Sequence, residues 1–425
     1  MNKIYFIDES LDMMGGVERI INTLSNDLVK KYDVELISLY KSNNETYFKY
    51  DDNIKINYIY KKSNLISKKY KKNKPLYYFI RLLEKANEFI TIKLGTKKYA
   101  KKVTNKDIVI FGRVPTALEF LPYINAKKII VREAMHLEYH KNKSKIKKYF
   151  PEKVDLFILS SDENMKSYKE FLGDAVKMIK IYNPLSITPK VINNVDVKNV
   201  ISIGRYDTHK GYDYLIRAFK IVSEKYPDWK LRIVGDGYYK PKMEELISDL
   251  NLNDNVLLVP ATKDVVKELN KASIYVMASR FEGYANALVE AMACGLSCIS
   301  YDWLMGVDEI IKHNENGLIV NLTDRYRYFK TLDIIDEDIN ILADMIIKTI
   351  EDKNMREKFK DEAPKIVNSR KKDKIIEKWL KIVCEENYGE KNKIFFSTYN
   401  FYNYHCHNNC TLLNRFKGFI VCKRR

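Results

Sequence analysis

The sequence contains no long apolar run and no secretory leader. Although 46% of its 425 residues are hydrophobic, no stretch approaches the roughly 18 uncharged apolar residues of a membrane-spanning helix. Met1 to Tyr5 leads directly into a predicted strand, where a leader would have a basic start and an apolar core. We therefore expect a cytoplasmic protein, long enough for two domains with well-filled cores.

The sequence has only six cysteines, and they are unevenly placed. Cys294 and Cys298 lie close together, whereas three others fall in the last twenty residues. This distribution is not typical of a disulfide framework, so we expect reduced thiols. Residues 405–410 (H-C-H-N-N-C) could be drawn as a metal site. No second ligand cluster stands at finger spacing, so a poorly ordered tail is the favoured interpretation.

Basic residues outnumber acidic ones, 74 to 56, and the formal net charge is +18. Such a charge favours a polyanionic partner, whether nucleic acid, acidic lipid or phosphorylated substrate. Residues 61–102 are strongly basic, and Leu76, Phe79, Leu83 and Ile90 follow a helical spacing within them. Two structures fit this segment: a basic amphipathic helix that contacts a membrane surface, and an ordinary helix with one buried face.

Predicted strands and helices alternate along most of the chain. Lys3–Ile7, Val17–Lys30 and Val34–Tyr40 have the patterns of strand, helix and strand, and the alternation restarts at Val200. Leu185–Asn199 has no period and mixes Pro, Asn and Asp, as a linker does. The pattern predicts an α/β protein with two Rossmann-like, doubly wound parallel sheets. We place the first domain at residues 1–184, the linker at 185–199, the second domain at 200–372, an amphipathic helix at 373–388 and a tail of unknown role at 389–425.

Residues 280–295 (R-F-E-G-Y-A-N-A-L-V-E-A-M-A-C-G) follow an apolar strand and are predicted to form a loop and a helix. On one continuous helix, Glu282 and Glu290 would lie about 80° apart and could not both face one ligand. We therefore expect Glu282 in the loop and Glu290 in the second turn of the helix, with Gly295 as the C-cap. The free amides of Gly283, Tyr284, Ala285 and Asn286 would then lie at a helix N-terminus, which suits a phosphate.

Three other loops follow predicted strands and carry polar or glycine residues. Gly15 and Gly16 open the first helix, where the backbone can approach a ligand closely. Arg205 and Lys210 share one loop and supply a planar fork and a point charge, as a diphosphate site requires. His136 follows the strand at 128–131 and lies where open α/β sheets bind ligands, with His140 as the alternative.

Taken together, these motifs resemble those of retaining glycosyltransferases of family 4. The stretch 282–295 is similar to the family's E-G-F-G-x-x-x-x-E-A-M-A-x-G, with Tyr284 and Ala285 in place of Phe and the second Gly. G-G-V-E-R at 15–19 resembles the N-terminal glycine loop, and G-R-x-x-x-x-K-G at 204–211 resembles the diphosphate clamp. The resemblance implies the GT-B fold, in which two Rossmann-like domains face a cleft and a closing helix, here 373–388, crosses back to the first domain.

The resemblance also implies a function and a set of roles. The reaction would be a retaining transfer from a nucleotide-diphosphate sugar to a hydroxyl of a glycan or lipid-linked acceptor, in bacterial surface polysaccharide biosynthesis. Glu290 would hold the ribose, Glu282 and His136 the donor sugar, and Arg205 and Lys210 the diphosphate. Acceptors of this kind place such enzymes at the inner face of the cell membrane, which favours the membrane interpretation of residues 61–102.

No D-x-D stands in a predicted donor loop, so we expect a metal-independent reaction without a cofactor. Two alternatives remain at this stage. One is a nucleotide-sugar epimerase of the same fold, for which we find no acid and base pair around the sugar. The other is a basic nucleic-acid-binding protein without catalysis, which would not need four separate loops with sugar and phosphate chemistry. We therefore expect no nucleic-acid partner.

Overall fold

The structure is a computed structural model, and it describes residues 3–13, 15–61, 72–192, 194–303, 306–324 and 335–384. The chain divides into two compact units, 1–390 and 391–425. All of the description below concerns the first unit. The candidate metal ligands at 405–410 and the rest of the tail lie outside the described residues.

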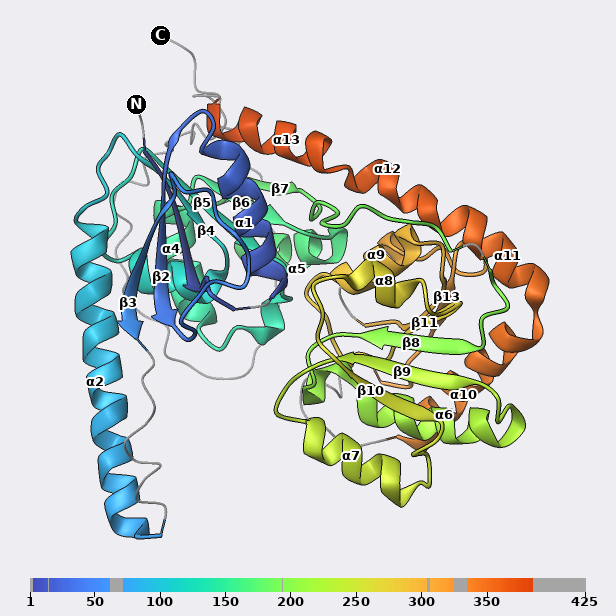
Figure 1. The fold of residues 1–425 in the computed structure, drawn as a ribbon. Helices are drawn as coiled ribbons and strands as arrows, with labels where there is room; N and C mark the ends of the chain where they lie inside the picture. The colour runs from blue at the N-terminus through green and yellow to red at the C-terminus, as the bar shows by residue number, and fades with distance from the viewer. Residues whose placement is uncertain are drawn as a thin grey trace, which may run out of the picture. The chain divides into compact units, whose positions relative to one another are not determined.

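The first sheet has seven parallel strands in the order β3-β2-β1-β4-β5-β6-β7 (Figure 1). Strands β4 (I-V-I-F) and β6 (L-F-I-L) are apolar throughout and are buried along their whole length because helices cover both faces. The strands are β1 Lys3–Ser10, β2 Asp33–Lys41, β3 Lys55–Lys61, β4 Ile108–Phe111, β5 Lys128–Glu133, β6 Leu156–Leu159 and β7 Met178–Lys180. The helices are α1 Gly16–Leu28, α2 Lys74–Ala100, α3 Val114–Phe120, η2 Leu137–Tyr139, α4 Lys143–Lys153 and α5 Asp162–Leu172.

The second sheet has six parallel strands in the order β10-β9-β8-β11-β12-β13. Its strands are β8 Asn199–Ile203, β9 Lys230–Gly235, β10 Val256–Pro260, β11 Ile274–Met277, β12 Ser297–Tyr301 and β13 Leu318–Val320. Its helices are η3 Thr208–Lys210, α6 Tyr212–Lys225, α7 Lys240–Asp249, α8 Val265–Leu269, α9 Asn286–Ala293, η4 Val307–Glu309, α10 Asp336–Glu351 and α11 Lys353–Glu362. Two Rossmann-like parallel-sheet domains are present, as the alternating pattern predicted.

No helix or strand occurs in the described residues between β7, which ends at Lys180, and β8, which begins at Asn199. The exact domain limits within this interval stay a prediction. At the other end of the second domain, η6 Ala363–Ile366, α12 Val367–Arg370 and α13 Lys372–Cys384 lead back to the first domain (Figure 1). Four buried apolar side chains of α13 pack in the core beside β1 and α1: Ile375, Trp379, Ile382 and Val383.

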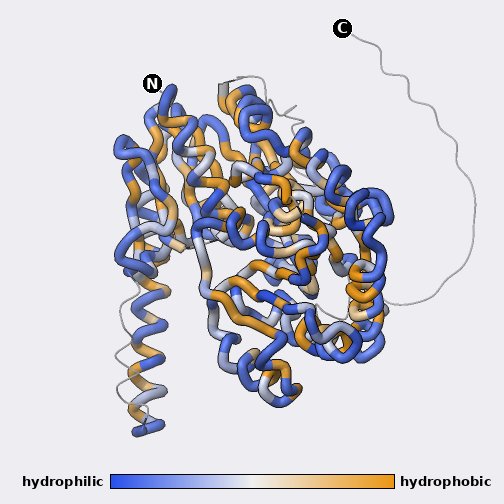
Figure 2. The backbone as a smooth tube through the Cα atoms, turned by 45° about the vertical axis from the view of Figure 1, so that its right-hand side comes forward, coloured by the Kyte–Doolittle hydropathy of each residue, from blue (hydrophilic) through white to orange (hydrophobic). Residues whose placement is uncertain are grey.

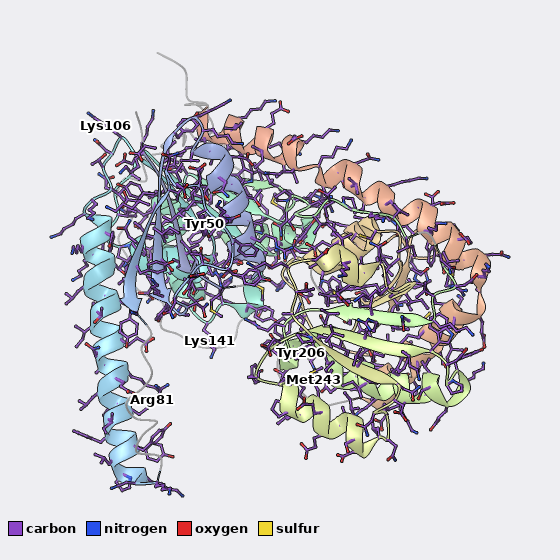
Figure 3. All side chains as sticks on the ribbon, viewed as in Figure 1. Tyr50, Arg81, Lys106, Lys141, Tyr206 and Met243 are labelled. Carbon is purple, nitrogen blue, oxygen red and sulfur yellow. The ribbon has the colours of Figure 1, made fainter. Side chains whose placement is uncertain are left out.

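Helix α2 extends beyond the sheet that it flanks (Figures 1 and 2). Its buried residues, Ile92, Thr96 and Ala100, all lie toward its C-terminal end. The projecting part carries side chains all around it, among them Arg81, labelled in Figure 3. Large apolar side chains are exposed along it: Leu76, Tyr78, Phe79, Leu82, Leu83, Phe89, Ile90 and Leu94. Four residues of the predicted apolar stripe, Leu76, Phe79, Leu83 and Ile90, are therefore exposed.

The packing of α13 predicts how strongly the returning helix stabilises the first domain. The Trp379 side chain is buried within that core, and replacing a buried Trp by Ala costs about 3–5 kcal/mol. Trp379→Ala should therefore lower the urea midpoint of unfolding markedly. The exposed Lys378 on the same helix supplies a matched control, and equal midpoints for Trp379→Ala and Lys378→Ala would contradict this packing.

Candidate functional site

A cavity of about 580 Å³ lies where the carboxyl ends of strands from both sheets converge. Its wall includes the last residues of β1, β8, β9 and β11 and the segments that follow them. This is the edge at which open parallel sheets bind ligands. Nine predicted site residues line it: Gly15, Gly16, Arg205, Lys210, Glu282, Tyr284, Ala285, Asn286 and Glu290.

The first helix begins in the cavity wall, with Gly15 as its N-cap. A Cβ atom on Gly15 would lie 2.0 Å from the Oε2 atom of Glu18, so a side chain there would displace that carboxylate. Arg113 donates to Glu18 at 2.7 Å and makes two bonds of 2.9 Å to the carboxylate of Asp8. Burial raises the pKa of Asp8 to about 6, and Arg113 opposes that shift. The glycine pair is therefore held in place by a buried charge network that sequence reasoning missed.

Helix α9 begins facing the start of α1, and its position along the sequence agrees with the spacing of the two glutamates. Glu282 lies in the loop and Glu290 lies in the second turn. The C-cap is Cys294, one residue before the predicted Gly295, which follows it with φ +77°. Another expectation was wrong. The backbone amide of Asn286 donates to the carbonyl oxygen of Tyr284 at 2.9 Å, so it is not free for a ligand.

The starts of α1 and α9 lie in contact. A Cβ atom on Gly16 would come within 2.8 Å of the Nδ2 atom of Asn286, so the absence of a side chain at Gly16 permits this approach. Each helix N-terminus carries partial positive charge from its unpaired amides. The cavity wall thus contains two positive helix ends from different domains, which favours an anion between them.

Each cation in the cavity wall is paired with a carboxylate. Lys210 contacts Glu282 at 2.7 Å, and Arg205 contacts Asp207 through its Nε atom at 2.9 Å. Within the described part of the chain, the terminal nitrogens of Arg205 make no hydrogen bond or ion pair. A ligand with phosphate oxygens could therefore meet this fork without displacing Asp207.

Glu290 is held from the first domain and from the segment before β8. Arg19 donates to its Oε1 atom, and the hydroxyl of Ser186 donates to the same atom at 2.9 Å. Burial raises the pKa of Glu290, while Arg19 and Ser186 oppose that shift. Arg19 is the last residue of the G-G-V-E-R motif, so the sequence motif already pointed to Arg19 as a site residue. No motif surrounds Ser186, so its contact with Glu290 could not be predicted from the sequence.

Arg280 connects the two loops that carry the basic and acidic residues. Its guanidinium makes a bidentate pair with Asp213 at 2.9 and 2.7 Å and donates to the Thr208 carbonyl oxygen at 2.6 Å. Close by, a Cβ atom on Gly211 (φ +63°) would lie 1.9 Å from the Ala278 carbonyl oxygen. The loop with Lys210 can therefore lie directly against the loop with Glu282.

His136 and Gly283 are the predicted site residues that do not line the cavity. The Nδ1 atom of His136 accepts from the backbone of Glu138 at 3.3 Å, and burial lowers the pKa of its imidazole. Gly283 lies against the segment just before that histidine, because a Cβ atom there would meet the Met135 sulfur at 2.8 Å. The alternative, His140, has its Nε2 atom 3.4 Å from Glu133.

No group of three or more His, Cys, Asp or Glu side chains among the described residues could hold a metal ion. No helix within the described ranges is long and apolar enough to cross a bilayer.

Comparison with known proteins identifies the chemistry. Residues 187–366 match the family model of glycosyl transferases group 1. An uncharacterized glycosyltransferase of Haemophilus influenzae is 28% identical over 354 residues, which cover 82% of this chain and 94% of that protein. The protein is a glycosyltransferase. The matches support the group 1 family, and nothing in them supports the epimerase alternative.

Two further similarities bear on the enzyme. A Campylobacter jejuni protein named N-acetylgalactosamine-N,N'-diacetylbacillosaminyl-diphospho-undecaprenol 4-alpha-N-acetylgalactosaminyltransferase is 27% identical over 343 residues, covering 76% of this chain and 87% of that protein. A crystal structure of a mutant S. aureus TarM in complex with fondaparinux, alpha-GlcNAc-glycerol and UDP superposes with a TM-score of 0.68 at 17% identity, covering 91% of this chain and all of that one. The glycosyltransferase has the GT-B fold.

Proposed function

We propose that the enzyme moves a sugar from a nucleotide-diphosphate sugar to a hydroxyl of a glycan or lipid-linked acceptor, with retention of configuration. The observation that carries this proposal is the cavity in which two helix N-termini meet beside Arg205 and Lys210. Positive helix ends and paired cations are the groups that a diphosphate requires. Retention and assignment to family 4 rest on the sequence motifs.

The contacts suggest a role for each acidic residue. Arg19 and Ser186 use the Oε1 atom of Glu290, so Oε2 is the atom to which ribose hydroxyls would donate. Glu282 shares its Oε1 atom between Lys210 and Ser279. In that position it would orient the donor sugar beside the cation that holds the diphosphate.

Arg205 and Lys210 would stabilise the negative charge that develops on the departing diphosphate. Lys210 has three donors, so it can keep Glu282 while it also binds a phosphate oxygen. In other transferases a divalent cation neutralises this charge. The paired basic residues are the basis for a metal-independent reaction, in which the leaving phosphate itself accepts the acceptor's proton.

The acceptor assignment draws on the relatives. The C. jejuni relative is named for transfer to a diphospho-undecaprenol-linked sugar, which supports a lipid-linked acceptor and a place in surface polysaccharide biosynthesis. The role of His136 beside the donor sugar rests on the motif resemblance, since His136 does not line the cavity. We keep the domain limits 1–184, 185–199, 200–372 and 373–388 as part of the proposal.

We further propose that residues 61–102 contact an anionic membrane at the inner face of the cell membrane. The observation is the exposed apolar face of α2, on which Leu82 and Phe89 are each 66% exposed. Lysine residues lie along the same helix, Lys85 and Lys93 among them. The Nζ atom of Lys93 lies 5.7 Å from the centre of the Phe89 ring, so the lysines are interspersed with the exposed apolar side chains. A surface that is both apolar and basic suits an anionic membrane.

The two glutamates test the proposed function. Glu290→Gln should weaken binding of both the nucleoside diphosphate and the intact donor by roughly 1.5–3 kcal/mol, as for lost bonds to a charged group. Glu282→Gln should leave diphosphate affinity nearly unchanged but lower turnover, by roughly tens to thousands of fold if the contact strengthens in the transition state. Calorimetry with the diphosphate and a transfer assay separate the two, and the exposed Glu315→Gln serves as control. Small, equal effects in all three variants would contradict the assignment.

The absence of a metal requirement has a direct test. With Arg205 and Lys210 in place of a cation, excess chelator should leave turnover nearly unchanged. The mechanism is wrong if chelator abolishes most of the activity and Mg²⁺ or Mn²⁺ restores it.

The membrane contact predicts a loss on removal of two exposed apolar side chains. Burying a Leu or Phe side chain contributes roughly 1.5–3 kcal/mol, so the double variant Leu82→Gln, Phe89→Gln should bind anionic vesicles at least roughly a hundredfold more weakly. Leu257, which is 50% exposed on β10, supplies the control substitution to Gln. Vesicle sedimentation measures the effect. Failure of the unmodified protein to bind vesicles would exclude the membrane contact.

A further inference from the structure

The side chain of Asn286 lies at the meeting point of α1 and α9, and its orientation is set from outside the cavity. Its Oδ1 atom accepts from the Nδ2 atom of Asn183 at 3.0 Å. The Oδ1 atom of Asn183 in turn accepts from the Nη2 atom of Arg132 at 2.6 Å. Arg132 and Asn183 are buried, whereas Asn286 lines the cavity.

The chemistry of the three groups allows only one order of donors and acceptors. A guanidinium donates and never accepts, so the atom of Asn183 that faces Arg132 is its oxygen. The amide nitrogen of Asn183 must then face Asn286, whose facing atom must accept and is therefore its oxygen. The remaining atom of Asn286, the amide nitrogen, is turned toward α1, where it lies against Gly16.

Arg132 fixes this order of donors and acceptors because its guanidinium is buried and charged. It lies at the end of β5 and is 4% exposed, and its Nη1 atom has no hydrogen-bond partner among the described residues. Burial lowers the pKa of Arg132 to about 10, so the group stays charged at neutral pH. A buried charge that depends on few partners is costly, and its remaining bond to Asn183 is correspondingly hard to replace.

We propose that the Nδ2 atom of Asn286 donates a hydrogen bond to a diphosphate oxygen of the sugar donor, and that Arg132 and Asn183 are positioning residues that turn this nitrogen toward the ligand. The proposal rests on the proposed function. It assigns a donor that the backbone cannot supply, because the amide of Asn286 is bonded to Tyr284. The proposal also explains why residue 16 is a glycine, since a side chain there would collide with the same nitrogen.

The substitution Asn183→Asp reverses the order without touching the ligand. Both oxygens of the new carboxylate accept, so Asn286 must turn its nitrogen toward residue 183 and its oxygen toward the cavity. An ion pair with Arg132 replaces the hydrogen bond from the charged guanidinium to the neutral amide oxygen, so thermal stability should be kept. A repelling oxygen in place of a donor should weaken binding of the diphosphate roughly tenfold to a hundredfold, the value of a hydrogen bond to a charged group.

The experiment measures calorimetric affinity for UDP, GDP and ADP, and follows the corresponding nucleosides by ligand-observed NMR. Asn183→Asp should weaken the diphosphate and leave the nucleoside unchanged. In an Asn286→Ala background, Asn183→Asp should have no further effect, because its influence passes through Asn286. Asn286→Asp gives a second route to the same loss if Asn183→Asp fails to fold.

The outcomes separate the two proposals. If the wild-type enzyme binds none of the three diphosphates, the proposed function and this inference are both wrong. If it binds one of them and Asn183→Asp binds it equally well, only this inference is wrong. Equal weakening of diphosphate and nucleoside, or additive effects of the two substitutions, would show a general structural role and overturn the positioning role.

Discussion

The close approach of α1 and α9 is the constraint on which the rest of the cavity depends. Gly16 lies against Asn286 across the boundary between the two domains, and a side chain at Gly16 would displace the Asn286 amide group. Around this point, Arg19 reaches Glu290, and Asn183 reaches Asn286. The positive helix ends can cooperate on one ligand only while the domains hold this distance.

Other contacts hold the domains in register away from the cavity. The carboxylate of Glu309 on η4 accepts from Lys180 at 2.9 Å and from the hydroxyl of Tyr182 at 2.8 Å. The guanidinium of Arg370 lies 3.4 Å from the centre of the Tyr182 ring and donates to the hydroxyl of Tyr284. Tyr284 belongs to the loop that carries Glu282. The helices that return to the first domain therefore also support the site.

The paired charges lower the cost of placing so many cations in one cavity wall. A buried cation or carboxylate without a partner costs several kcal/mol, and the cavity wall contains both kinds. Arg113 is neutralised by Glu18 and Lys210 by Glu282, both carboxylates of the same wall. Guanidinium and ammonium groups have several N–H donors, so they can bind a phosphate with the donors that the ion pairs leave unused. Ligand binding therefore need not break these ion pairs.

The sequence by itself determined the parallel sheets and the local shape of the binding loops. Alternating apolar periods reflect burial of each strand and helix, and the positions of Glu282 and Glu290 followed from helix geometry within one short stretch. Tertiary structure alone decided which atoms those loops present. The amide of Asn286 is bonded within its own turn, and its side chain is oriented by Arg132, more than 150 residues away in sequence. It also left the apolar face of α2 exposed, because a helical period shows that a face exists but not what covers it.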